Sequence, residues 1–349
     1  MASTVVGLDL GHGVLRAAEI ADAGKARPTL VRYHHIPIPL SAVDRGEVVE
    51  AGTVASALKQ LWAQGGFKSK KVVLGVGNQR VLVRDLSLPK APIERIKESL
   101  PFQVQDVLPV PVAEALLDFY PVSESREEGR EVVNGLLVAA VKEAVLANVE
   151  AVQAAGFEPI EVDLIPFALT RSMLVGAAAR GTVALVHVGA VTTSIIVAVD
   201  GIPHFVRVMQ NGGDDITKAL TTSLAIDARQ ADQIKRGLGL SSDSVSTEWR
   251  QAVEVIYQST GDLMGGIRNT LSFYVSTRPG IVIDRIVVSG GGAELIGFNK
   301  ALADLTRLPV ATTDPLDRFT VARTVNRESL QSGYSGLAVA AGLALGSKA

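Results

Sequence analysis

Two phrases of the chain share one pattern of apolar and polar positions. Residues 5–20, VVGLDLGHGVLRAAEI, and residues 183–199 each run from an apolar segment through a glycine turn into a second apolar segment. Short apolar runs that are bounded by glycine are typical of buried strands joined in a hairpin. The repeat therefore predicts two related halves that each begin with such a hairpin.

Strand and helix patterns alternate along the rest of the chain. Residues 29–40, 71–77 and 80–88 read as further strands, and residues 53–66 read as a helix that Thr53 could cap. A regular alternation of strands with helices predicts an α/β fold.

The middle of the first half reads as an inserted unit over residues 89–160, with two helical segments around a strand pair that turns at SESREEGR. The predicted domains are a first domain at 1–88, completed by about 160–182 and 333–349, and a second domain at 183–332. A helical subdomain is expected within the second domain at about 212–278. The small-residue helix SGLAVAAGLALG, residues 335–346, is expected to pack against the first half.

Composition narrows the class of protein. The chain has 349 residues, 47% of them apolar, and a net charge of −2. This is enough for two domains with their own cores and argues against nucleic-acid binding. With no cysteine, a disulfide framework and a thiolate metal site are excluded. The N-terminus has no secretory pattern, and the uncharged residues 182–199 contain glycine and hydroxyl residues, which favours two strands over a membrane span. A cytoplasmic protein is expected.

Three glycine turns follow three apolar strands: DLGHG at 9–13, HVGAVTTS at 187–194 and VSGGGAELIG at 288–297. Glycines let backbone N–H groups approach phosphate oxygens, and serine or threonine hydroxyls add further donors. Any one of these turns could be purely structural. Together, in this order, they predict a site for a nucleotide.

The order of the turns resembles that of the actin, Hsp70 and sugar-kinase superfamily, and in particular of the PilM family of type IV pilus assembly proteins, which is similar to FtsA. The resemblance spans nearly the whole chain and rests on GLDLGHGVLRAAEI, LPVPVAEALLDFYPV, VDLIPFAL, NGGDDITKAL, ARQADQIKRGLG and VVSGGGAELIGFNKAL. It implies an actin-like, duplicated ribonuclease H-like fold with two main domains flanking a nucleotide cleft and a small inserted subdomain. It also implies ATP and Mg²⁺ as cofactors.

The resemblance also implies a role for each matching residue. Asp9 would orient a Mg²⁺-bound water. Arg16 stands where the family often has lysine, and it could equally be a surface charge on a strand. Lys235 could equally be a solvated residue on a helix. The other implied positions are Gly11, His12 and Gly13 in the first phosphate turn, Gly189, Thr192 and Thr193 in the second, Gly213 with Lys235 near the nucleoside, and Gly290, Gly291 and Gly292 against adenosine.

His187 departs from the family pattern, because most relatives have an aspartate there that helps to hold Mg²⁺ and the attacking water. Ile165 stands where relatives often have an acidic residue. Neutral imidazole is a poor ligand for a hard, oxygen-preferring ion. The hypothesis is that the chain binds ATP and hydrolyses it slowly or not at all. The alternative is that another residue holds the water and His187 packs at a strand end.

The resemblance implies a partner as well: the cytoplasmic N-terminal peptide of PilN, lying as an extended segment in a groove between residues of about 78–119 and the first domain. The chain would then take part in pilus assembly and twitching motility, peripheral to the inner membrane through this partner.

Two alternatives stay open. An FtsA-like membrane filament would need a basic amphipathic helix, which the terminal GLALGSKA does not provide. A small-molecule kinase would need a substrate base, and no loop offers an obvious aspartate.

Overall fold

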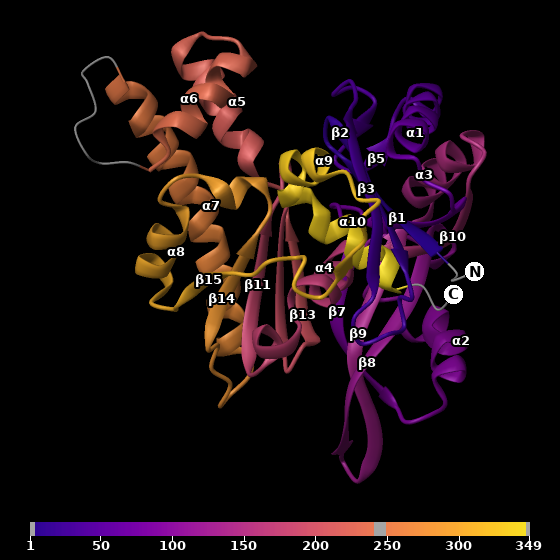
Figure 1. Cartoon of the computed structure of the whole chain (residues 1–349). Helices are drawn as coiled ribbons and strands as arrows, with labels where there is room; N and C mark the ends of the chain where they lie inside the picture. The colour runs from indigo at the N-terminus through magenta and orange to yellow at the C-terminus, as the bar shows by residue number, and fades with distance from the viewer. Residues whose placement is uncertain (1–3, 241–248, 347–349) are drawn as a thin grey trace. The chain divides into compact units, whose positions relative to one another are not determined.

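The computed structural model describes residues 4–240 and 249–346 and divides into two compact units. Unit 1 comprises Met1–Val175, Gly201–Val206 and Pro315–Ala349, and unit 2 comprises Gly176–Asp200 and Arg207–Asp314. Both predicted hairpins are present, and helices alternate with strands along the chain (Figure 1). The α/β prediction is therefore confirmed.

The first hairpin lies near the centre of a six-stranded sheet in unit 1. β1 pairs antiparallel with β2 and parallel with β6. The strand order is β10-β6-β1-β2-β3-β16, and the strands are β1 (Thr4–Gly11), β2 (Val14–Ala21), β3 (Thr29–Pro37), β6 (Lys71–Val76), β10 (Glu158–Leu164) and β16 (Thr320–Val321), with a separate pair β4 (Val43–Asp44) and β5 (Glu47–Val48).

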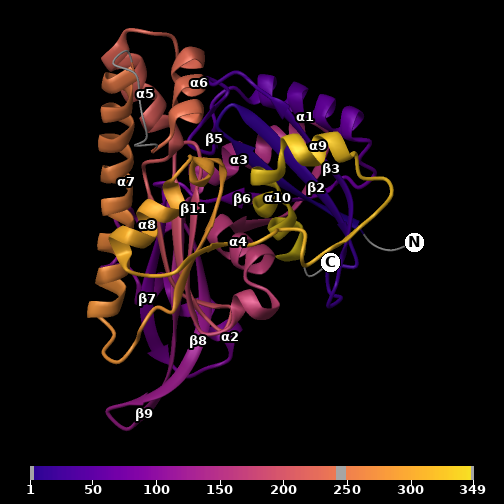
Figure 2. The same cartoon turned by 60° about the vertical axis from the view of Figure 1, so that its left-hand side comes forward.

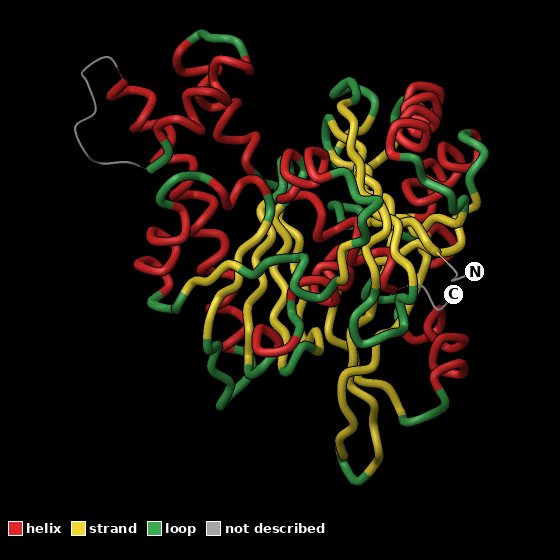
Figure 3. The backbone as a smooth tube through the Cα atoms, in the orientation of Figure 1, coloured by secondary structure: helices red, strands yellow, loops and turns green. Residues whose placement is uncertain are grey.

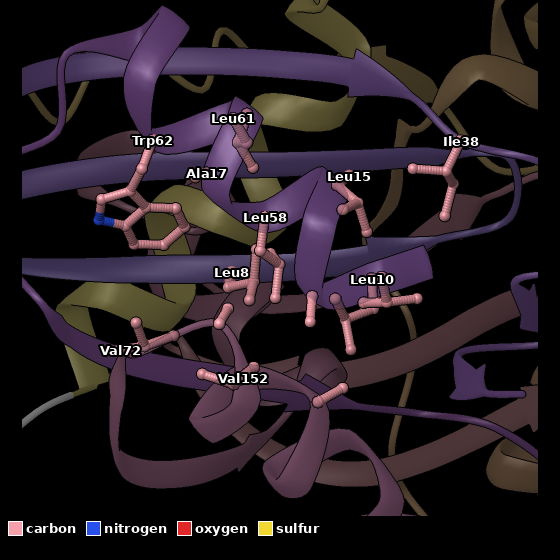
Figure 4. Packing of buried hydrophobic residues seen from close by; sticks show 14 of the residues in the cluster. Leu8, Leu10, Leu15, Ala17, Ile38, Leu58, Leu61, Trp62, Val72 and Val152 are labelled. Carbon is pink, nitrogen blue, oxygen red and sulfur yellow. The ribbon is translucent and has the colours of Figure 1, made fainter. Parts of the chain in front are cut away.

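Helices α1 (Ala51–Gly65) and α3 (Lys142–Ala154) cover one face of this sheet. Leu8 and Leu15 from the hairpin pack with Leu58 of α1 and Val152 of α3 (Figure 4). The predicted cap at Thr53 is wrong. The helix begins at Ala51, and the Thr53 hydroxyl donates to the Glu50 carboxylate at 2.8 Å.

Helix α10 (Tyr334–Gly346) covers the opposite face, beside α4 (Ile165–Met173) and α9 (Arg327–Ser332). Its packing is close enough to require glycine. A Cβ at Gly7 would lie 1.9 Å from the Ala340 carbonyl oxygen, and one at Gly342 would lie 2.0 Å from that of Ala168. The expected packing of this helix against the first half is therefore confirmed. No helix of the described residues is long and apolar enough to cross a membrane.

A three-stranded sheet with the order β7-β9-β8 forms a separate part of unit 1. It contains β7 (Val81–Pro89), β8 (Ala115–Glu127) and β9 (Arg130–Val141), with α2 (Ile93–Gln103) and the short 3-10 helix η1 (Val112–Glu114). Residues of α2 share a core with the sheet, and Figure 3 shows the β8–β9 hairpin extending well beyond α2. The sheet spans 81–141, whereas the sequence predicts 89–160, because α3 and β10 pack with the six-stranded sheet instead.

Unit 2 is built on a sheet with the order β13-β12-β11-β14-β15. Its strands are β11 (Thr182–Val188), β12 (Thr193–Val199), β13 (Ile202–Met209), β14 (Arg285–Ser289) and β15 (Val310–Thr312). Its helices are α5 (Gly213–Leu224), α6 (Ala228–Leu238), α7 (Arg250–Ser276) and α8 (Phe298–Thr306), with 3-10 turns η2 (Gly176–Ala179) and η4 (Gly291–Glu294). α5, α6 and α7 pack together in the predicted helical region (Figure 2).

Candidate functional site

The first glycine turn is a two-residue hairpin loop made by His12 and Gly13. Gly11 ends β1 opposite Val14, and Gly13 has φ of 73°. Positive φ at this point of a tight hairpin favours glycine, because it has no Cβ to clash with the backbone. The predicted first-turn residues are thus contiguous at the end of two central strands of the sheet.

Asp9 and Arg16 face each other across this hairpin. They are register partners, and Arg16 Nη1 donates to Asp9 Oδ2 at 3.0 Å. Burial raises the pKa of Asp9, and the neighbouring Arg16 guanidinium opposes that rise. Arg16 is therefore the partner of a buried carboxylate, and the alternative of an isolated surface charge does not describe it.

Unit 2 brings three glycine segments together that are far apart in the sequence. The Gly213 N–H donates to the Gly189 carbonyl oxygen at 2.9 Å, so the N-terminus of α5 is tied to the β11–β12 turn. A Cβ at Gly213 would lie 3.4 Å from Gly292 Cα, and one at Gly290 would lie 2.3 Å from the Val188 carbonyl oxygen. A side chain at Gly290 would push the segments apart, whereas a Cβ at Gly213 would only make ordinary contact with Gly292.

The N–H groups at the start of α5 are largely used inside the protein. Asp214 N–H donates to the Ala190 carbonyl oxygen at 2.8 Å, and Gly212 N–H donates to Asp215 Oδ2 at 2.8 Å. A helix N-terminus binds anions through its free N–H groups. Here it serves mainly to hold the β11–β12 turn in position.

His187 ends up beside the third glycine turn. It is the register partner of Ser289 on the parallel strand β14, and its Nδ1 lies 2.9 Å from Ser289 Oγ. Of the two predicted threonines, Thr192 accepts the Gly189 N–H at its carbonyl oxygen, 2.9 Å away. Thr193 is fully buried, and its hydroxyl donates to the Asn211 carbonyl oxygen at 2.8 Å. The Thr193 side chain thus stabilises the turn from within.

Lys235 is buried, so the alternative of a solvated helix residue is wrong. Its ammonium group donates to Thr217 Oγ1 at 2.7 Å and to the Gly213 carbonyl oxygen at 3.2 Å, and it pairs with Asp232 at 2.8 Å. Asp232 also pairs with Arg236 at 2.7 Å. Burial by itself would raise the pKa of Asp232, but the hydrogen bonds from Lys235 and Arg236 outweigh it and lower the pKa.

Asp232 and Ser289 were missed in the sequence. Asp232 lies three residues before Lys235, which places both on one face of a helix, so the spacing was available as a signal. Ser289 has no such local signal, because its contact with His187 depends on the pairing of β11 with β14.

A small pocket lies where the two sheets of unit 1 meet. It is lined by the end of β6, the start of β7, the end of β9 and the first turns of α3, including Asn78, Val81, Ala144, Val145 and Asn148. Asn78 Nδ2 donates to Glu47 Oε1 at 2.9 Å, and Arg80 pairs with the same carboxylate at 3.2 Å. The pocket therefore combines apolar walls with a charged rim, and it includes part of the predicted groove wall at 78–119.

Known proteins share both the sequence pattern and the architecture of this chain. Residues 7–348 match the family described as type IV pilus assembly protein PilM. The solved PilM–PilN type IV pilus biogenesis complex is 26% identical, with a TM-score of 0.84 over 98% of this chain and 97% of that chain. EutJ of Carboxydothermus hydrogenoformans is 17% identical, with a TM-score of 0.57 over 99% of this chain and 90% of that chain.

Two further proteins are similar, one in structure and one in sequence. MreB5 of Spiroplasma citri bound to AMPPNP is 12% identical, with a TM-score of 0.55 over 97% of each chain. The cell division protein FtsA of Bacillus subtilis (strain 168) is 25% identical over 227 residues, 58% of this chain and 51% of FtsA. The chain thus spans about half the length of that curated relative.

The paired hairpins, the converging glycine turns and these neighbours define an actin-like protein. The family match covers nearly the whole chain. The chain belongs to the PilM family of type IV pilus assembly proteins.

Proposed function

We propose that this chain is a cytoplasmic component of the type IV pilus assembly complex at the inner membrane, and that it binds ATP and a peptide partner. The observation that carries the nucleotide proposal is the convergence of Gly189, Gly213 and Gly290–Gly292 within unit 2. Glycine backbone can approach a nucleoside and its phosphates closely, because it carries no side chain.

Calorimetric titration of the nucleotide-stripped protein with ATP and with ADP tests this proposal. A matched pair of variants strengthens it. Gly292→Ala would place a methyl group within 2.4 Å of Val188 Cγ1, whereas Gly261→Ala adds the same group in open space on α7. We expect binding to be lost only in the first. Failure of the wild-type protein to bind either nucleotide would refute the proposal.

Mg²⁺ would accompany ATP on its phosphates, and Asp9 could meet it only through water. Among the described residues, no group of three or more histidine or acidic side chains could hold a metal ion. Since Asp9 is already paired with Arg16, the described residues do not fit a metal ion held by the protein itself.

Hydrolysis is proposed to be slow, because position 187 carries an imidazole bonded to Ser289 rather than a carboxylate. Steady-state phosphate release by the native protein and by His187→Asp tests this. An increase in the variant is expected, and an unchanged rate in a variant that still binds ATP would contradict the role given to position 187.

The proposed partner is the cytoplasmic N-terminal peptide of PilN, since the similar solved structure is a PilM–PilN complex. We propose that it binds in an extended conformation across the surface around the small pocket between β6, β7, β9 and α3, where its side chains can pack against the apolar walls and its polar groups can reach the Glu47–Arg80 rim.

Fluorescence anisotropy with a labelled peptide of the PilN N-terminus encoded in the same genome tests this. Ala144→Arg fills the pocket, whereas Leu146→Arg changes an exposed position two residues further along the same helix. Only the first should abolish binding. Equal binding by both variants, with both shown to be folded by circular dichroism, would exclude this pocket.

The FtsA-like filament and kinase alternatives gain no specific support from the structure. The last residues of the terminal GLALGSKA segment, Ser347–Ala349, lie outside the described residues.

A further inference from the structure

One end of the six-stranded sheet in unit 1 carries a set of exposed basic side chains. Ala21, at the end of β2, is the register partner of both Thr4 and Thr29, so β1 and β3 start at this end. β6 starts there as well, because it runs parallel to β1. The β2–β3 loop at 22–28 and the loop before β6 at 66–70 therefore leave the sheet at the same edge. The exposed basic residues of this basic edge are Lys25, Arg27, Lys68, Lys70 and Lys71.

A buried carboxylate holds the backbone of the loop before β6. Glu19 is 1% exposed. Its Oε2 accepts from Arg32 Nη1 at 2.8 Å and from the Lys68 N–H at 3.4 Å, and its Oε1 accepts from the Ser69 N–H at 3.3 Å. The charge of Glu19 is thus neutralised inside the protein by Arg32. The side chains of Lys68 and Lys70 remain exposed.

The β2–β3 loop is also held in place. Ala23 packs against the apolar core beneath α10. The Lys25 N–H donates to the Asp22 carbonyl oxygen at 2.9 Å, and Arg27 Nε donates to the Phe319 carbonyl oxygen at 3.4 Å. The Lys25 ammonium group pairs with Asp22 at 3.0 Å, and its side chain is still 68% exposed. Both loops therefore present basic groups on backbone that the fold positions.

The basic edge has a positive charge that the chain as a whole does not have. Beside its five basic residues it carries two carboxylates that are at least partly exposed, those of Asp22 and Glu158. The neighbouring loop before β16 adds Asp317 and Arg318, whose charges balance. The net charge of the whole chain is −2, so the positive charge is local to this edge. A local field of this kind favours an anionic partner.

The spacing of the basic groups suits an extended anionic surface. The loops start from β3 and β6, and the strand order β6-β1-β2-β3 places three strand intervals between them. Neighbouring strands lie about 4.8 Å apart, so the two loops are about 14 Å apart. A single phosphate ion cannot contact both loops, whereas the headgroups of a bilayer can. Each basic side chain near an anionic bilayer strengthens binding about fivefold.

The basic edge and the pocket proposed for the partner peptide lie at opposite ends of β6. Lys71 begins this strand, and Val76, which ends it, lines the pocket. At about 3.3 Å per residue, the two ends are about 17 Å apart, a distance that an extended peptide covers in about five residues. A short peptide can therefore reach the pocket while the edge contacts a bilayer. Two weak attachments that act together bind much more firmly than either does alone.

We propose that the basic edge of unit 1 binds the headgroups of anionic phospholipids, as a second attachment to the inner membrane besides the partner peptide. It rests on the proposed function only for the presence of a membrane beside the chain. The binding itself is a property of this chain and can be measured without the partner.

Flotation of the full chain with lipid vesicles tests the proposal. Vesicles of phosphatidylglycerol and phosphatidylethanolamine supply the anionic surface, and vesicles of phosphatidylcholine are the uncharged comparison. The chain should float with the anionic vesicles only. Binding should be lost in about 1 M NaCl, where the Debye length is about 3 Å.

Two triple variants with the same change in net charge show whether the basic edge is the surface that binds. The edge variant combines Lys68→Gln, Lys70→Gln and Lys71→Gln. The control variant combines Arg84→Gln, Arg95→Gln and Lys142→Gln, at exposed positions on β7, on α2 and at the start of α3. The edge variant should bind anionic vesicles at least about tenfold more weakly than the wild type, and the control within about twofold of it.

The outcomes separate this proposal from the proposed function. Equal loss in the two variants would mean that net charge alone sets vesicle binding and would overturn the proposal. A wild-type chain that binds duplex DNA but no vesicles would overturn it in favour of a nucleic-acid surface. The edge variant should keep its circular dichroism spectrum and its affinity for the labelled PilN peptide. Failure of the wild-type chain to bind that peptide would count against the proposed partner and leave vesicle binding to be judged by itself.

Discussion

Replacing Lys235 by methionine removes the ammonium group that joins α6 to the start of α5. Methionine keeps the length and apolar stem of the side chain but cannot donate. The Thr217 hydroxyl and the Gly213 carbonyl, both in buried residues, would lose their donor at 2.7 and 3.2 Å. Asp232 would keep its ion pair with Arg236 and is partly exposed, so loss of the Lys235–Asp232 pair adds little to the cost.

The expected cost follows from these contacts. A hydrogen bond to a charged group contributes about 1.5–3 kcal/mol, and the packing of the methionine stem offsets part of the loss of two such bonds. We therefore expect the free energy of unfolding of unit 2 to fall by about 2–4 kcal/mol. At about 2–4 °C per kcal/mol for domains of this size, the midpoint should fall by about 5–15 °C.

The chain offers a way to measure unit 2 alone. Its two tryptophans are Trp62 in unit 1 and Trp249 in unit 2. Urea unfolding in a Trp62→Phe background, followed by the fluorescence of Trp249, reports on unit 2. Arg236→Met is the control, because Arg236 shares Asp232 but has a side chain that is 66% exposed, and it should cost about 0–1 kcal/mol. Equal costs below about 1 kcal/mol for both variants would refute the reasoning about burial.

Three further predictions concern unit 1. Gly342→Ala should destabilise it by more than about 3 kcal/mol in urea unfolding, since the new methyl meets the Ala168 backbone, whereas Gly52→Ala should cost nothing; similar midpoints for the two would contradict the close packing of α10. Asn148→Ala should cost about 2–4 kcal/mol by the same measurement, because its amide makes two hydrogen bonds of 2.8 Å to the backbone around β5, and a loss under about 0.5 kcal/mol would show these bonds to be dispensable. Burial lowers the pKa of His35 below its ordinary value of 6.5. The neutral side chain therefore contributes to the stability of the fold above that pH, and this contribution is lost as pH falls through the lowered pKa. The urea midpoint should fall less between pH 7 and 5 in His35→Gln than in the wild type, and an equal fall in both would count against this assignment.

The sequence predicts the parts of this protein that are encoded locally. The hairpins at 5–20 and 183–199 follow from apolar runs that meet at glycine, a pattern that needs no knowledge of distant contacts. The limits of the three-stranded sheet do not follow in this way. The pattern of α3 shows that the helix has an apolar face but not which sheet that face covers.

Side-chain roles depend still more on distant contacts. Arg16 and Lys235 each allow a surface interpretation in sequence, and only the pairing with Asp9 and the contact with Gly213 decide against it. The reason for glycine at 336 cannot be seen locally either, because the side chain that an added Cβ would meet is Arg16, on a strand more than three hundred residues earlier. Physical proximity that the sequence does not encode locally is the information that the structure adds.

The position of α10 has a consequence for synthesis of the chain. The helix covers one face of the sheet that contains β1, β2 and β6, and all three strands are made early. Until residues 334–346 have left the ribosome, that apolar face stays open to solvent and to other nascent chains. Exposed apolar sheet surface favours aggregation. Unit 1 therefore completes its fold only after unit 2 has been translated, and chains interrupted before residue 334 should be substrates for chaperones and proteases.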